Sequence, residues 1–180
     1  MNRQGVSDVT ISTRTRTILT YGQPILRQVA RPVHGIDGEL QQLIDEMVEI
    51  MYAAPGVGLA ANQVGRLERV FVANPSEDHD PGKLLVLINP ELAESEVEIV
   101  AEEGCLSIPE FREEVRRARR VLLRGLDRNG RPVEIEGEEL LARIFQHELD
   151  HLNGILFVDR LSPAKRDILL RKLKKAFRPR

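Results

Sequence analysis

Several features that define particular classes of protein are missing from this chain of 180 residues. It has a single cysteine, so no internal disulfide can form, which fits a reducing cytoplasm. No apolar run approaches the roughly 18 residues needed to cross a bilayer. The formal net charge of -2 does not suggest a protein that binds DNA or other nucleic acid with its surface as a whole.

The sequence therefore predicts one domain with a core of its own, because 42% of the residues are hydrophobic and no internal repeat divides the chain. Residues 1–16 are predicted to form a flexible arm in front of a folded domain over residues 17–180. The arm has no apolar segment, so we expect no secretory signal and a cytoplasmic protein of bacterial type. Its Ser, Thr and Arg content is also typical of organellar transit peptides, although Asp8 and its shortness count against import.

The segment from His147 to His151 reads HELDH and carries the clearest chemical signal. Two histidines four residues apart on a helix lie on the same side, so both imidazoles can bind one metal ion. Glu148 would then lie beside the ion, where it can take a proton from a water and later return it. The helix is supported by the absence of Pro and Gly between Glu138 and Asn153, and by Gly154 at the position of a C-terminal cap.

Two imidazoles do not complete a catalytic metal site, which normally has three protein ligands and one open position. Six residues after His151, where a common metalloprotease pattern has a third histidine, the chain has Phe157. Asp159 and the single cysteine, Cys105, remain as candidates. With Asp159 the site would be that of a metallopeptidase that uses His147, His151 and Asp159, and Cys105 would merely be buried.

The overall pattern predicts an α+β fold in which short antiparallel strands pack around one buried central helix, the helix that carries the HExxH motif. Further helices are predicted over Gly38–Ala53 and from Ser162–Pro163 onward. Short strands are predicted at 70–73, 84–88, 91–101, 114–124, 133–136 and 155–158. Asn89–Pro90 is predicted to end the second of these strands.

Three segments, in this order, closely resemble the motifs of the peptide deformylase family. They are GVGLAANQ at 56–63, EGCLS at 103–107 and HELDHLNG at 147–154. The resemblance extends from about Thr17 to the Lys/Arg-rich C-terminus. It implies a metal-dependent hydrolase that removes the formyl group from the N-terminal formylmethionine of newly made proteins and releases formate.

The resemblance also implies that Cys105 is the third metal ligand, beside His147 and His151. One thiolate and two neutral imidazoles leave an open position on a divalent ion. This ligand set suits Zn²⁺ and Fe²⁺ alike. The family association favours Fe²⁺, with Ni²⁺ or Co²⁺ as active substitutes and Zn²⁺ often recovered.

The remaining site residues follow from the same resemblance. Glu148 is implied as the general acid and base, and Gln63 and the backbone N–H of Leu106 as the donors that stabilise the oxyanion. The positions implied in substrate binding are Gly56, Val57, Gly58, Ile108, Arg112 and Ile144. Arg112 matches a position at the pocket mouth in relatives, but it is equally consistent with one more solvated arginine in a run.

The C-terminal segment, residues 165–180, carries eight Lys or Arg and one Asp. An enzyme that acts on new chains must meet them at the ribosome, so a contact with ribosomal RNA is one hypothesis. Favourable charges near a helix C-terminus explain the same composition without a partner.

Exchange of Lys172, Lys174 and Lys175 for Glu separates these two explanations. We expect the triple variant to sediment with ribosomes less than the wild type at low salt, and the difference to shrink at moderate salt because phosphate contacts are screened. Equal sedimentation of the two proteins would reject the contact.

Overall fold

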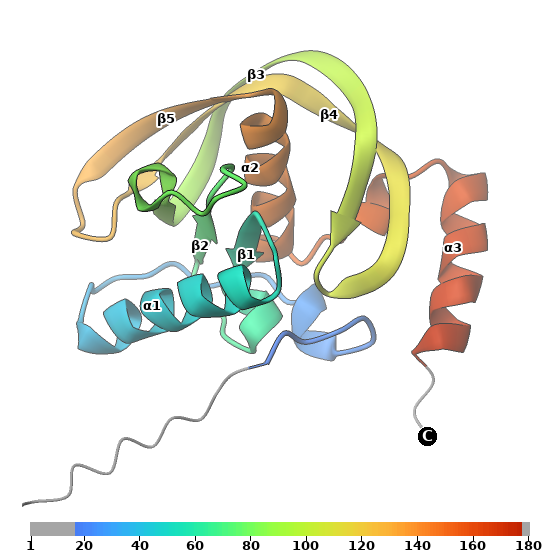
Figure 1. Cartoon of the computed structure of the whole chain (residues 1–180), viewed down its shortest axis with the longest axis horizontal. Helices are drawn as coiled ribbons and strands as arrows, with labels where there is room; N and C mark the ends of the chain where they lie inside the picture. The colour runs from blue at the N-terminus through green and yellow to red at the C-terminus, as the bar shows by residue number, and fades with distance from the viewer. Residues whose placement is uncertain (1–16, 178–180) are drawn as a thin grey trace, which may run out of the picture.

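The computed structural model describes residues 17–177, and the predicted arm over residues 1–16 lies outside this range. The described part is a single domain of three α-helices and a five-stranded antiparallel sheet with neighbouring strands in chain order (Figure 1). The strands are β1 (Gly58–Ala60), β2 (Val70–Ala73), β3 (Leu85–Cys105), β4 (Ile108–Leu126) and β5 (Pro132–Glu138). The helices are α1 (Gly38–Ala53), α2 (Glu139–Leu152) and α3 (Pro163–Ala176). The predicted α+β class is confirmed.

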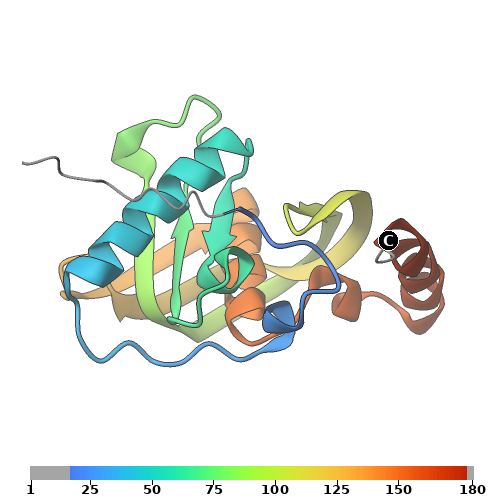
Figure 2. The same ribbon diagram turned by 90° about the horizontal axis from the view of Figure 1, so that it is seen from below.

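Helix α1 has the bounds predicted from its apolar spacing. The Asp37 side chain accepts a hydrogen bond from the Leu40 backbone N–H at 3.0 Å and so caps the first turn. Its apolar stripe, which includes Met47 and Met51, is buried against β1 and β2. Helix α3 lies on the side of the molecule away from α1 and packs on the short 3₁₀ helix η4 (Phe157–Arg160) (Figures 1 and 2). No helix in the range 17–177 is both long and apolar enough to cross a membrane.

Strands β3 and β4 are much longer than the short strands predicted, which is a correction to the expected fold. The sequence interpretation ended a strand at Asn89–Pro90, whereas β3 continues to Cys105. Asn89 has a φ of 52°, and the register with β4 shifts between Ile88 and Glu91, so the chain passes an irregularity without leaving the sheet. Pro90 is tolerated because pairing with β2 stops at Ile88. Figure 1 shows the two long strands arching together around α2.

The strand predicted at 155–158 is also wrong, since this segment leads into η4. The Asp159 carboxylate accepts the backbone N–H of Leu156 at 2.9 Å and thereby closes the turn. The same carboxylate forms an ion pair with Arg27. A local side-chain hydrogen bond of this kind competes with extended structure, which an apolar run alone does not reveal.

Helix α2 packs against β1, β2, β4 and β5. One side of the helix contributes Phe145 to the core, where its ring centroid lies 5.9 Å from that of Phe71 on β2. Gly137 of β5 allows the helix to start close to the sheet, because a Cβ at this position would lie 2.9 Å from Phe145 Cδ2. The other side of α2 carries His147 and His151.

A buried arginine of β4, Arg117, links the sheet to α2 by hydrogen-bonded ion pairs. Arg117 donates two hydrogen bonds to the Glu103 carboxylate of β3, at 3.0 and 2.7 Å, and one to Asp150 of α2 at 2.5 Å. Asp150 also accepts a hydrogen bond from Arg160 at 3.0 Å. The side chains of Arg117 and of both acids are at most 8% exposed. Glu103 therefore depends on the Arg117 guanidinium to balance its charge, whereas Asp150 shares two arginines, Arg117 and Arg160.

We expect Arg117→Ala to lower the free energy of unfolding by about 3–5 kcal/mol, because it removes the only arginine within residues 17–177 that pairs with the buried Glu103 and leaves Asp150 with Arg160 alone. Thermal or urea unfolding followed by circular dichroism measures the change. Arg116→Ala is the matched control on the same strand, since Arg116 pairs with Glu98 at the surface and its loss should cost about 1 kcal/mol or less. Equal changes in the two variants would contradict the central position of Arg117.

Candidate metal centre and active site

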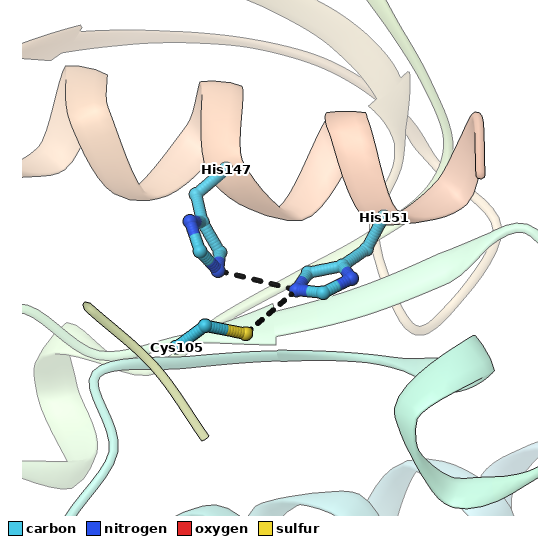
Figure 3. A group of neighbouring side chains, drawn as sticks. All are labelled: Cys105, His147 and His151. Carbon is cyan, nitrogen blue, oxygen red and sulfur yellow. Dashed lines mark hydrogen bonds between the residues drawn. The ribbon is translucent and has the colours of Figure 1, made fainter. Parts of the chain in front are cut away.

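Three possible metal ligands from two elements come together beside α2. His147 and His151 are one turn apart on the helix, and Cys105 is the last residue of β3. Cys105 Sγ lies 3.2 Å from His151 Nε2, which lies 3.2 Å from His147 Nε2 (Figure 3). The three ligand atoms are all within 4.8 Å of one another. The fold thus brings the single cysteine to the two histidines, although 46 residues separate it from His151.

These three side chains fit a divalent metal ion. Bonds of about 2.0–2.1 Å to nitrogen and about 2.3 Å to sulfur, at tetrahedral angles, place neighbouring donor atoms about 3.3–3.6 Å apart. Two of the three separations are 3.2 Å, close to this spacing, and all three are within 4.8 Å. One sulfur and two imidazoles from the protein leave the fourth position of such an ion open, as catalytic sites require.

A carboxylate behind the cluster orients one of the histidines. Glu103 Oε1 lies 2.6 Å from His147 Nδ1. This contact favours a proton on Nδ1, and Nε2 is the ring nitrogen that faces the cluster. Burial raises the pKa of Glu103, but the hydrogen bonds from His147 and Arg117 outweigh burial and bring the pKa to about 2. Glu103 is therefore ionised at neutral pH.

The charges around the two histidines favour a bound cation. Burial lowers the pKa of His147, but the neighbouring Cys105 and Glu103 outweigh burial and raise that pKa well above its ordinary value. Burial, together with the nearby His147, lowers the pKa of His151 well below its ordinary value. The site therefore stabilises one positive charge between a sulfur and a carboxylate, which is the charge pattern that a metal ion provides.

Glu148 lies against the backbone of β1, where a glycine makes room for it. A Cβ at Gly58 would lie 2.9 Å from Glu148 Cδ and closer still to Oε1. Burial raises the pKa of Glu148 to about 7, and its Oε2 has no hydrogen-bond partner among the described residues. A carboxyl group with a pKa near neutrality can both accept and donate a proton at pH 7.

The Gln63 side chain faces the cluster from the short 3₁₀ helix η2 (Ala61–Val64), which follows β1. Its Oε1 accepts the backbone N–H of Ala60 at 2.9 Å, which fixes the amide. Its Nε2 donates to Ser107 Oγ at 3.1 Å and lies 3.7 Å from Cys105 Sγ. Sequence reasoning identified Gln63 but missed Ser107 as its partner, and it missed the contacts of Glu103, Arg117 and Asp150. Both Glu103 and Ser107 flank Cys105 in the EGCLS segment, so their proximity to the cysteine was the available signal.

A cavity of about 540 Å³ opens beside these residues. Apart from His151, which is 1% exposed and lies behind the other ligands, every site residue predicted from the sequence lines this cavity. These residues are Gly56, Val57, Gly58, Gln63, Cys105, Leu106, Ile108, Arg112, Ile144, His147 and Glu148. The fold thus brings them together, while their individual roles stay predictions. The alternative ligand, Asp159, does not belong to the cluster and is instead paired with Arg27.

Comparisons with known proteins agree with this geometry. The sequence profile of a family described as polypeptide deformylase matches residues 15–167. The peptide deformylase of Thermodesulfovibrio yellowstonii is 50% identical over 157 residues, which are 87% of this chain and 95% of that protein. The peptide deformylase of Syntrophobacter fumaroxidans is 51% identical over 158 residues, covering 88% of this chain and 93% of that protein.

Solved structures resemble the fold as well. A peptide deformylase from Legionella pneumophila superposes with a TM-score of 0.84 at 47% identity, covering 91% of this chain and 99% of its own. A peptide deformylase from Synechococcus elongatus in complex with actinonin superposes with a TM-score of 0.83 at 40% identity, covering 92% of each chain. Sequence and fold therefore point to the same family.

The close approach of Gly58 and Glu148 predicts that Gly58→Ala destabilises the protein by about 1–3 kcal/mol, as overpacking does in a filled interior. Gly35→Ala is the control, because a Cβ at Gly35 meets no atom within 4 Å. Combining Gly58→Ala with Glu148→Ala should remove most of the cost, since the colliding carboxyl group is then absent. If the changes in free energy of unfolding caused by the two substitutions simply added in the double variant, a steric clash between a Cβ at position 58 and the Glu148 carboxyl group would be contradicted.

Proposed function

The chain belongs to the polypeptide deformylase family, and from this premise we propose how its residues carry out deformylation. The protein is a hydrolase that removes the N-formyl group from newly made proteins. Water adds to the formyl carbon, the C–N bond to methionine breaks, and formate leaves together with a free amino terminus. The domain that does this is residues 17–180, and the cavity beside Cys105 is where the formyl group binds.

Cys105, His147 and His151 would hold the metal on which the family depends. Their donor spacing and the charge pattern around them support this assignment. When bound there, a divalent ion supplies a Lewis acid that polarises the formyl carbonyl and lowers the pKa of a water. We propose Fe²⁺ as the resident ion on the basis of the family resemblance, with Ni²⁺, Co²⁺ or Zn²⁺ able to replace it, because the sulfur and nitrogen ligand set suits several of these ions.

The proton transfers are assigned to Glu148. Its carboxylate takes a proton from the attacking water and returns it to the amine nitrogen as the C–N bond breaks. Burial supports both halves of this task, because it raises the pKa of Glu148 to about 7. The Oε2 atom without a protein partner is free to bind the water. This single feature, a buried carboxyl group with an open oxygen beside the ligand cluster, carries the proposal.

The oxyanion that forms when water attacks needs hydrogen-bond donors. We assign this role to the Gln63 side-chain amide and to the backbone N–H of Leu106. Gln63 is suited to it because Ala60 and Ser107 hold its amide in one orientation before substrate arrives. Loss of one such donor in other enzymes costs about 2.7–4 kcal/mol of transition-state stabilisation.

The substrate is an extended formylmethionyl peptide. Its backbone would pair with the small-residue segment Gly56–Gly58 and with the chain around Ile108, by addition of a strand to exposed backbone. The methionine side chain would enter between Ile144 and Ile108, and Arg112 would stand at the mouth. The nearly complete burial of Ile108 and Ile144 supports an apolar pocket there. We further propose that the protein acts in the cytoplasm and that its basic C-terminal segment contacts the ribosome.

We expect wild-type protein loaded with Fe²⁺ or Ni²⁺ under anaerobic conditions to release formate from formyl-Met-Ala-Ser. Glu148→Gln should lower kcat about 10²–10⁴-fold while the bound metal stays stoichiometric, because the amide cannot carry the proton. Metal content by mass spectrometry and formate release measure the two effects separately. Glu98→Gln is the control, since this exposed residue pairs with Arg116 away from the cavity.

The outcomes distinguish the function from the role of the residue. No formate from fully metallated wild type would reject deformylation by this chain. Full activity in Glu148→Gln would instead reject Glu148 as the proton carrier and leave the function intact.

A further inference from the structure

The cavity mouth contains an arginine whose charge is not matched by a carboxylate. Arg143 is on α2, four residues before His147, and it lines the cavity. Its Nη1 donates one hydrogen bond, to the backbone carbonyl of Glu102 at 3.1 Å. A guanidinium has five N–H donors. Within residues 17–177 this is the only hydrogen bond that Arg143 makes, and it forms no ion pair.

The other charged groups at the mouth leave Arg143 available to a ligand. Arg112 and Glu102 form a rim pair at 3.4 Å, in which both side chains are about two-thirds exposed, so these two charges largely offset each other. Glu103 lies deeper and is neutralised by Arg117. Two further carboxyl groups line the cavity: Glu148, which is buried, and Glu110, which comes from β4 rather than from α2.

We propose that Arg143 is a specificity-determining residue that favours substrates with Asp or Glu in one of the two places after the formylmethionine, the one whose side chain turns toward α2. This inference rests on the proposed function. Arg143 is one helical turn from a candidate metal ligand, so it lies close to where the formyl group must be held. A substrate carboxylate there can receive two N–H donors in parallel, which is the strongest geometry for such a pair.

Glu110 does not cancel the charge of Arg143, because the two residues would contact different side chains of the substrate. Side chains of an extended peptide alternate from one face to the other. A residue turned toward α2 therefore meets Arg143, and its neighbour turned toward β4 meets Glu110. The substrate would thus pass between a positive charge on α2, from Arg143, and a negative charge on β4, from Glu110.

The hydrogen bond to Glu102 does not by itself require an arginine. A neutral side-chain amide at position 143 could donate to the same carbonyl and tie α2 to β3. A purely structural role is thus met by glutamine, whereas discrimination between charged substrates needs the guanidinium. This difference makes Arg143→Gln the informative substitution.

The test is a comparison of kcat/KM for formyl-Met-Asp-Ser, formyl-Met-Asn-Ser and formyl-Met-Lys-Ser, with a second series carrying the variable residue in third place. We expect the wild type to favour Asp over Lys about three- to tenfold at low ionic strength, mainly through KM, and the preference to fall at high salt. Arg143→Gln should abolish the preference, and Arg143→Glu should reverse it. Arg116→Gln, an exposed arginine outside this cavity, should keep it.

Ratios within one variant are independent of how much of that variant is folded and loaded with metal. Equal kcat/KM for all peptides in the wild type, or an unchanged preference in Arg143→Gln, would overturn the role of Arg143 while formate release still supports deformylation. Absence of formate from every peptide would overturn the proposed function itself, and the inference with it.

Discussion

The buried carboxylate of Glu103 is the point at which the sheet and the candidate metal centre depend on each other. It accepts hydrogen bonds from Arg117 on one side and contacts His147 Nδ1 on the other. A buried anion is stable only when it is paired and hydrogen-bonded. Strands β3 and β4 and helix α2 must therefore keep one register for both contacts to persist. The Glu103 carboxylate that links the sheet to α2 thus also orients His147, a candidate metal ligand.

A second constraint is that β1 has a glycine, Gly58, at the point where it passes Glu148. A Cβ at Gly58 would lie 2.9 Å from Glu148 Cδ, so only a glycine lets the strand pass this close to the carboxyl group. Burial of this carboxyl group raises its pKa to about 7. The group proposed to transfer protons is thus packed against a glycine of another element. A larger residue at position 58 would have to displace the carboxyl group.

Local sequence patterns were enough to predict those parts of the site that lie on a single helix. The spacing of His147, Glu148 and His151 needs only the helix period, so sequence alone predicted their arrangement. Cys105 was one of two open candidates until the family resemblance, because no local rule relates β3 to α2. The contacts of Glu103 with Arg117 depend on strand register, and the length of β3 depends on how Asn89 absorbs an irregularity. Both are long-range effects, and both were missed.

The side of α2 that faces the cavity becomes more exposed from the candidate metal ligands toward the first turn of the helix. His151 and His147 are buried, Ile144 is 4% exposed, and Leu140 at the first turn is 40% exposed. The ligands at the buried end are fixed by contacts with β3 and β4, so substitutions there disturb the core. Arg143, near the open end, has one hydrogen bond to the protein and can change at little cost to stability. The fold thus separates the residues proposed to perform the reaction from the residue proposed to select which peptides enter.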